Sequence, residues 1–405
     1  MTTTDEGAGQ LVVDSRYLDA VRQVLDELGI EGKQHADAPA FDLTLLDLVH
    51  VEPRPDPVTK ELVRPKVADL DPVLTELRLR LARRCGGWVP PLGKNRQMTS
   101  QFGAYPQTKS HALWDPIPVL DVPEGWLEGD EGNGIRVGLL DTAIPHHDNV
   151  PDDSIEAVGF TKATSDAAVY FEEGHGLFMA GLVLQEAPKA KLIARAALDD
   201  KGKASAWDVV KKLEEFFTDE PDRRVHVLVL ASGCRTHDGK APLILERAIE
   251  RLNRRMTVVA AAGNHGAVAG MTPDLQITRD SPTWPAALPG VVAAGVPTPF
   301  PEANLSDERN LDYSPDLPWV TCTVNPGATG EFVSSYPASA EVEMLSGSKV
   351  DLSSGFASWR GTSCAAAQLG GALAARMATG LDATAALEAL EQRPDIEKYS
   401  WTYKK

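Results

Sequence analysis

The chain has 405 residues, of which 43% are hydrophobic and 24% are charged, and its formal net charge is −18. This length is typical of one large domain joined to a smaller one, and the composition is that of a globular protein. Because an acidic surface repels nucleic acid and anionic membranes, we exclude both as partners.

The sequence shows no targeting segment and no membrane span. Its first residues have neither a basic nor an apolar region, and no stretch approaches the roughly 20 apolar residues that cross a bilayer. The few cysteines form no close pair such as C-x-x-C, which argues against a zinc site and fits a reducing compartment: Cys85, Cys234, Cys322 and Cys364. We therefore expect a cytoplasmic protein.

Residues 1–85 predict a small α+β domain. Ser15 is placed to cap the first helix, and Gly29 to end it. The predicted strands and helices of this domain are residues 11–13, 17–28, 41–51 and 70–84. Residues 86–118 are dense in glycine and proline, which predicts an extended linker.

Residues 119–405 predict a doubly wound α/β domain. Apolar strands without polar alternation are expected at Ile135–Asp141, Lys191–Ala196, Val225–Ala231, Thr257–Ala262 and Val291–Val296. Helices are expected at His175–Ala187, Trp207–Phe217, Leu243–Leu252, Thr362–Met377 and Ala383–Leu390. This alternation predicts a mostly parallel sheet with helices on both faces. The active crevice of such a sheet lies outside the carboxyl ends of its strands.

Four short segments place reactive or polar residues where that crevice is expected: Gly138–Ile144, Gly174–Gly181, Val258–Gly266 and Gly361–Ala367. Each has a simple structural explanation when it is taken alone. Asp141 can form a turn, His175 and Ser363 can cap helices, and Asn264 can occupy a tight turn. Together, in the order Asp, His, Asn and Ser, they are far more specific.

These segments resemble the motifs of the subtilisin-like serine peptidase family. The family patterns are Asp-Ser/Thr-Gly, His-Gly-Thr-His-Val-Ala-Gly, Ala-Ala-Gly-Asn and Gly-Thr-Ser-Met-Ala-x-Pro, and the order of Asp141, His175 and Ser363 is that of subtilisin. Residues 283–295 and 319–327 are similar to later family stretches. The resemblance covers roughly residues 120–380 and implies the subtilisin-like fold. Residues 1–115 match no recognisable family.

Several positions depart from the family patterns, and none of them removes a reacting group: Ala143, Leu177, Phe178, Cys364 and Ala367. Cys364 does not replace Ser363 as the nucleophile, because neighbouring helical residues point about 100° apart. The departures bear on substrate preference and rate.

The resemblance implies a serine endopeptidase that works through an acyl-enzyme. Ser363 would be the nucleophile, His175 its general base and then acid, and Asp141 the residue that orients the imidazole. The amide of Asn264 and the backbone N–H of Ser363 would stabilise the oxyanion. His147, which follows the acid, is expected to be structural.

The resemblance also implies a groove for a peptide or protein substrate. Its walls around the residue before the scissile bond would be Ala231, Ser232, Gly233, Ala261, Ala262 and Gly263. Plain strand packing explains any one of these residues equally well. Calcium is common in the family, but the sequence has no acidic cluster with ligand spacing, so we predict no metal and no cofactor.

Three alternatives stay open at this point. The chain could be a catalytically silent binding module, or a peptide ligase or macrocyclase, which Ala367 motivates because it replaces a helix proline near the nucleophile. The N-terminal region, residues 1–115, is hypothesised to be a propeptide-like inhibitory domain that contacts the cleft. An adaptor or recognition module is the other interpretation of that region.

Overall fold

The computed structural model describes residues 9–55, 61–100, 115–158, 169–236, 238–266, 278, 281–297, 313–315, 319–327, 330–339, 341–344 and 347–398. Contacts divide the chain into two units. Unit 1 holds Met1–Gln97, Ser205–Thr218 and Ala241–Arg251, and unit 2 holds the rest of the chain. Within the described residues, no helix has both the length and the apolar character needed to cross a membrane.

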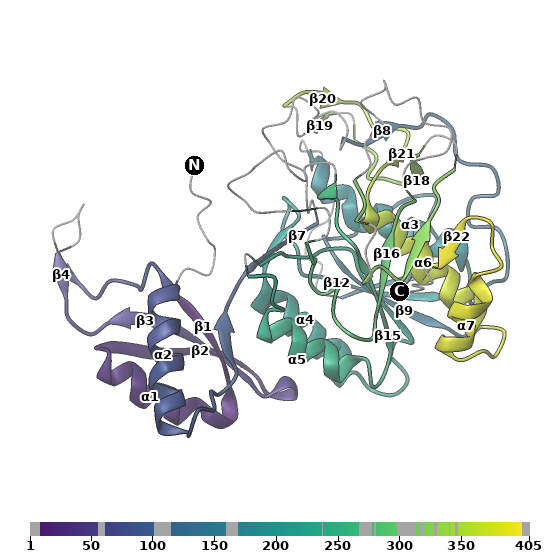
Figure 1. Ribbon diagram of the computed structural model, residues 1–405. Helices are drawn as coiled ribbons and strands as arrows, with labels where there is room; N and C mark the ends of the chain where they lie inside the picture. Colours follow the sequence, from purple (N-terminus) through teal and green to yellow (C-terminus); the bar gives the residue numbers. More distant parts are fainter. Residues whose placement is uncertain are drawn as a thin grey trace. The chain divides into compact units, whose positions relative to one another are not determined.

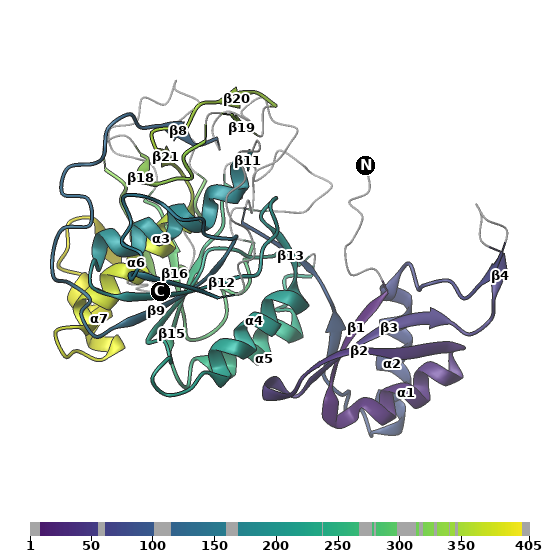
Figure 2. The same cartoon turned by 180° about the vertical axis from the view of Figure 1, so that it is seen from behind.

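Unit 1 contains a four-stranded antiparallel sheet with two helices packed against it (Figure 2). The strands, in spatial order, are β2 (Ile30–Ala38), β3 (Leu43–His50), β1 (Gln10–Asp14) and β6 (Leu92–Lys94). The helices are α1 (Leu18–Glu27) and α2 (Leu70–Arg84), and a short hairpin of β4 (Arg54–Pro55) and β5 (Leu62–Val63) adds to them. Apolar side chains of α1, α2 and the sheet form one buried core.

The structure confirms the predicted strands near residues 11–13 and 41–51 and both predicted helices, and it adds two strands to the sheet besides the β4–β5 pair. β2 escaped prediction because its central residues are polar and exposed. β6 lies in the segment predicted as an extended linker, yet it pairs with β1. The predicted cap at Ser15 is wrong: the first turn is a 3-10 helix, and its capping carboxylate is Asp14, which accepts from the Arg16 N–H at 3.1 Å.

Unit 1 also includes α4 (Ala206–Thr218) and most of α5 (Leu243–Leu252). Polar contacts tie these helices to the sheet and its loops. Glu214 Oε1 accepts from the Ala40 N–H at 2.8 Å. Arg247 pairs with the buried Asp14 carboxylate at 3.0 Å. The same carboxylate also pairs with Arg16, so two guanidinium groups compensate its buried charge.

Unit 2 is built on an eight-stranded sheet whose first seven strands are parallel and whose last strand is antiparallel. Its spatial order is β10 (Ile155–Val158), β12 (Lys191–Ala196), β9 (Arg136–Asp141), β14 (Val227–Leu230), β15 (Thr257–Ala261), β16 (Val291–Gly295), β17 (Cys322–Val324) and β22 (Ile396–Lys398). This sheet confirms the predicted α/β fold, and β10, β17 and β22 extend it beyond the predicted strands.

Two buried helices, α3 (His175–Glu186) and α6 (Thr362–Met377), lie side by side against this sheet (Figure 1). Glycines allow the close approach. A Cβ on Gly371 would lie 2.5 Å from the Val183 carbonyl oxygen, and one on Gly370 would lie 2.4 Å from a methyl of Val229. The predicted Ala- and Gly-rich helix at 362–377 is confirmed, and α7 (Ala383–Leu390) follows it.

Short elements complete the framework around the sheet. They are β7 (Gln97–Thr99), β8 (Ile117–Pro118), β11 (Val169–Tyr170), β13 (Lys203–Ser205), β18 (Phe332–Ser335), β19 (Val342–Glu343), β20 (Lys349–Val350), β21 (Phe356–Trp359) and the 3-10 turn Phe171–Gly174. That turn leads directly into His175 at the start of α3.

Candidate active site

Asp141 is the last residue of β9, at the carboxyl edge of the parallel sheet. Its side chain is only 1% exposed. One carboxylate oxygen, Oδ1, accepts from the Thr142 N–H at 2.7 Å and lies 2.7 Å from Nδ1 of His175. The strand end therefore presents a buried carboxylate directly to the imidazole, as the sequence predicts.

His175 is the first residue of α3 and is buried. Because a carboxylate only accepts hydrogen bonds, its bond to Nδ1 assigns the proton to that nitrogen and leaves Nε2 as the acceptor. Nε2 has no hydrogen-bond partner among the described residues. The imidazole packs edge-on against Trp359 at 5.5 Å between ring centroids. The sequence analysis did not identify this indole, which limits how the ring can turn.

Thr142 fixes the two segments to each other. Its Oγ1 accepts from the Gly176 N–H at 2.9 Å and donates to the Glu173 carbonyl oxygen at 3.1 Å. A Cβ on Gly176 would lie 2.5 Å from the Thr142 carbonyl oxygen. The glycine after His175 is therefore required for the close contact between the end of β9 and the start of α3.

Ser363 and Asn264 meet at the start of α6. Asn264 Oδ1 accepts from the N–H and the Oγ1 of Thr362, at 2.9 and 3.1 Å, which identifies the oxygen end of its amide. A Cβ on Gly361 would lie 3.1 Å from Ser363 Oγ and 3.4 Å from Asn264 Nδ2, so the two groups border the same point. Gly361 has φ 144°, which favours glycine.

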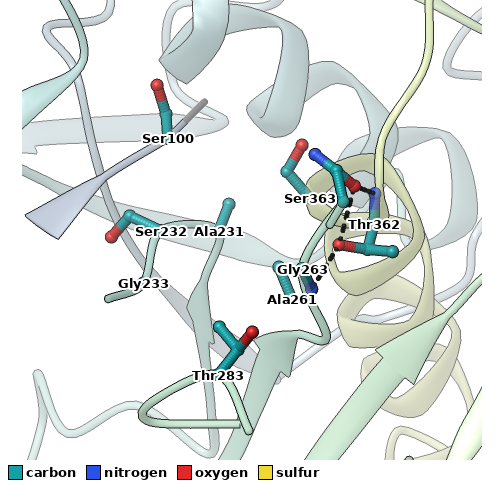
Figure 3. A pocket seen from close by; sticks show the side chains of 10 residues that line it. Ser100, Ala231, Ser232, Gly233, Ala261, Gly263, Thr283, Thr362 and Ser363 are labelled. Carbon is teal, nitrogen blue, oxygen red and sulfur yellow. Dashed lines mark hydrogen bonds between the residues drawn. The ribbon is translucent and has the colours of Figure 1, made fainter. Parts of the chain in front are cut away.

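A small pocket, partly open to solvent, lies beside Ser363 and Asn264. Five of the six predicted wall residues line it, namely Ala231, Ser232, Gly233, Ala261 and Gly263. Ala262 does not; it is fully buried, and its N–H donates to the Ala294 carbonyl oxygen at 2.9 Å. Thr283 and Ser100 also line the pocket and were missed by the sequence analysis (Figure 3).

A strand from the segment predicted as a linker enters this site. Thr99 and Gly233 exchange two backbone hydrogen bonds, of 3.0 and 3.1 Å. The Ser100 N–H donates to the Gly202 carbonyl oxygen at 2.9 Å, and β7 pairs with β13. Residues 94–102 contain neither glycine nor proline, unlike their surroundings, and this was the available sequence signal for a strand.

The ionisable groups around the site differ in their roles. Burial raises the pKa of Glu172 to about 7, against smaller opposite effects that include Lys203 and His175. Burial also raises the pKa of the Cys364 thiol far above its usual range, so it stays protonated and inert. His147 is fixed by a 2.7 Å contact of Nε2 with the Gly355 carbonyl oxygen, which agrees with its expected structural role.

Among the described residues, no group of three or more His, Cys, Asp or Glu side chains could hold a metal ion.

Asp141 at the end of β9 is bonded to His175 at the start of α3, and Ser363 lies at the start of α6. This arrangement on a parallel sheet is that of the subtilisin-like fold. Residues 132–389, more than half of the chain, match the Subtilase family. The chain therefore belongs to that family.

The chain is similar to several proteases. It is 29% identical to a thermostable alkaline protease of Halalkalibacterium halodurans, over 44% of this chain and 45% of that protein. It is 30% identical to subtilisin Savinase of Lederbergia lenta, over 37% of this chain and 55% of that protein. The matches thus span about half the length of these relatives. A solved lanthipeptide protease has 20% identity and a TM-score of 0.45, over 65% of this chain and 81% of that chain.

Proposed function

We propose that the chain is a serine endopeptidase that hydrolyses peptide bonds through an acyl-enzyme on Ser363. The 2.7 Å bond between Asp141 and His175 is the main support, because a buried carboxylate on Nδ1 leaves Nε2 as the base that a serine nucleophile needs. The named proteases among the relatives support the same class of activity. The cytoplasmic location stays a prediction from the sequence.

The proposed reaction begins when Nε2 of His175 takes the proton of the Ser363 hydroxyl as Oγ attacks the substrate carbonyl carbon. The Asp141 carboxylate stabilises the imidazolium that forms. That imidazolium then protonates the leaving amine as the peptide C–N bond breaks. Water, deprotonated by the same imidazole, hydrolyses the acyl-enzyme and restores the serine.

The amide of Asn264 is proposed to stabilise the negative charge on the substrate oxygen. Thr362 holds Oδ1 of this amide with two hydrogen bonds, so the amide nitrogen is left to face Ser363 and Gly361. A donor placed in advance costs no reorganisation when the charge develops. The backbone N–H of Ser363, at the start of a 16-residue helix, is the second proposed donor.

Labelling with a fluorophosphonate tests the proposal on the full chain. The wild-type protein should be labelled, and the Ser363→Ala protein should not. If neither the folded wild-type protein nor the Thr99→Pro variant, in which β7 is released from Gly233, is labelled, the result would support a silent binding module instead. Mass spectrometry of products separates peptidase from ligase, since only hydrolysis gives new carboxylates that contain oxygen from labelled water.

We further propose that the N-terminal region inhibits the site as a propeptide-like domain. The Thr99–Gly233 pairing and the Ser100–Gly202 bond support this, because they add a strand to the cleft in the way that peptides bind at sheet edges. Thr99→Pro removes the N–H that donates to Gly233, whereas Thr99→Val keeps it. Faster fluorophosphonate labelling of the Pro variant alone is expected; equal rates in both variants would contradict inhibition.

A further inference from the structure

Trp359 gives the imidazole of His175 a second restraint. The bond from Asp141 holds the ring at Nδ1 only, and a ring held at one atom can still pivot about that atom. Trp359 is 3% exposed, and its indole lies nearly perpendicular to the imidazole, with 5.5 Å between the ring centroids. Edge-to-face packing of this kind is favourable and specific in its geometry. The contact therefore limits the directions in which Nε2 can point.

The indole is itself held by a packed aromatic cluster. Three buried rings lie against it, with centroids 5.5 to 6.1 Å away: Phe171, Phe178 and Tyr336. Phe178 is one of the positions that depart from the family patterns. Because a protein core is closely packed, the indole cannot leave the imidazole without displacing these rings.

Glu331 holds the residues on both sides of Trp359. β21, which ends at Trp359, lies between β8 and β18 in a three-stranded sheet (Figure 1). Side chains alternate across a strand, so Ser358 and Arg360 point to the face opposite the indole. On that face, Ser358 Oγ donates to Glu331 Oε2 at 2.9 Å, and Nε and Nη2 of Arg360 donate to Oε1 at 3.2 and 2.7 Å. One carboxylate thus fixes the direction in which the indole is presented.

The ion pair between Glu331 and Arg360 is largely removed from solvent. The two side chains are 16% and 11% exposed. Hydrogen bonds between ionised partners are roughly twice as strong as neutral ones, and loss of one partner leaves the other charge uncompensated. Arg360 directly precedes Gly361, whose φ of 144° begins the turn into Ser363. The same carboxylate therefore acts on the turn that carries the serine.

We propose that Glu331 and Trp359 are positioning residues of this site. They hold the imidazole of His175 and the turn that carries Ser363 in the geometry that proton transfer requires. The proposal rests on the proposed peptidase function and adds the residues that keep its reacting groups aligned. The indole acts through its contact with the imidazole, and Glu331 acts through Trp359 and Arg360. Since a misplacement of about 1 Å can slow a reaction ~10²-fold, loss of either restraint should lower the rate of the chemical step.

Saturation kinetics of fluorophosphonate labelling test the proposal on the full chain. The rate constant at saturating probe reports the reactivity of Ser363, and the half-saturating concentration reports probe binding. We expect Glu331→Gln to lower the rate constant at least ~10-fold, the effect of one charge-assisted hydrogen bond, and to leave the half-saturating concentration unchanged. Trp359→Leu should lower the rate constant ~10²-fold. Trp359→Phe keeps an aromatic ring against the imidazole and should stay within ~5-fold of the wild type.

Glu186→Gln is the matched control for Glu331→Gln. Glu186 also pairs with an arginine, Arg393, and the two side chains are 14% and 25% exposed. It is the last residue of α3, roughly 16 Å along the helix from His175. The control should lower the Tm to a similar extent and leave the labelling rate unchanged. Equal labelling rates in the two Gln variants would overturn the proposal, as would equally slow Phe and Leu variants of Trp359 or a Leu variant as fast as the wild type.

NMR of the histidine rings decides the same question without catalysis. The ring current of an indole shifts the imidazole signals, and Glu331→Gln removes no ring. A change in the His175 signals, assigned by their loss in His175→Ala, therefore means that the indole has moved relative to the imidazole. We expect this change in Glu331→Gln and not in Glu186→Gln, and unchanged signals in both would overturn the proposal. If neither the wild type nor Thr99→Pro is labelled, the peptidase function is contradicted, and these spectra still decide the positioning.

Discussion

Thr362→Val removes the hydroxyl that holds the proposed oxyanion donor while it keeps the shape of the side chain. The Thr362 Oγ1 accepts from the Gly263 N–H at 2.8 Å and donates to Asn264 Oδ1 at 3.1 Å. In the variant the buried Gly263 N–H loses its partner, which costs about 1–3 kcal/mol. Since 1 kcal/mol lowers the Tm of a domain of this size by roughly 2–4 °C, we expect a fall of roughly 2–12 °C.

Activity should fall by less than it would if the amide itself were deleted. Asn264 keeps its 2.9 Å bond from the Thr362 N–H, so the variant loses one of two restraints. We expect labelling of Ser363 by a fluorophosphonate to slow ~5-fold, the effect of about 1 kcal/mol. Removal of the oxyanion amide costs ~10²–10³ in kcat, a figure measured in subtilisin itself.

Differential scanning fluorimetry and the labelling rate measure the two effects on the same samples. Thr362→Ser keeps the hydroxyl. Its Tm and labelling rate should therefore lie close to those of the wild type and far above those of Thr362→Val. The reasoning is refuted if Thr362→Val melts and labels like the wild type. It is equally refuted if the Ser variant is as impaired as the Val variant, because the hydroxyl would then not be the cause.

Three further substitutions test the surroundings of the imidazole. Gly176→Ala should nearly abolish labelling, because its Cβ would lie 2.5 Å from the Thr142 carbonyl oxygen and would displace the start of α3. Tyr336→Phe removes the 2.7 Å hydrogen bond to the Phe171 carbonyl oxygen and should cost about 1 kcal/mol in chemical denaturation. Burial raises the pKa of Glu172 from 4.5 to about 7, so the folded state retains a proton that the unfolded state has released. Wild-type stability should therefore fall as pH rises from 4.5 to about 7, and Glu172→Gln should flatten that decline; parallel pH profiles would disprove the assignment.

The sequence predicted the parts of the fold that depend on local patterns. The helix at 362–377 and the strand at 191–196 match α6 and β12 because their periodicity and their flanking residues act within one segment. Strand β7 was missed because it is only three residues long and pairs with a distant strand, and its one local sign, the lack of glycine and proline over residues 94–102, is weak. β2 was missed for a different reason, since a strand with an exposed polar centre lacks the apolar alternation by which strands are identified.

The residues of the candidate site likewise fall into those that local patterns predict and those that distant segments supply. Asp141 and His175 were predictable because a strand end and a helix start fix their places on the sheet. Thr283 was not, because its position depends on contacts with Gly233 and Gly263, which come from other parts of the chain. Trp359 is also supplied from a distant segment, β21, and packs against the imidazole. Neighbours that lie close only in the folded protein thus complete the site.

The polar atoms left unsatisfied in the cleft connect stability to function. Asp141 Oδ2, His175 Nε2, Ser232 Oγ and Thr283 Oγ1 are all buried without a hydrogen-bond partner among the described residues. Each such atom costs about 1–3 kcal/mol, a large fraction of the roughly 5–15 kcal/mol that stabilises a folded domain. Of these atoms, Ser232 Oγ and Thr283 Oγ1 line the pocket beside Ser363, where a bound peptide can supply the missing partners. The two unmet hydrogen bonds in the pocket, which weaken the free protein, therefore favour a bound peptide.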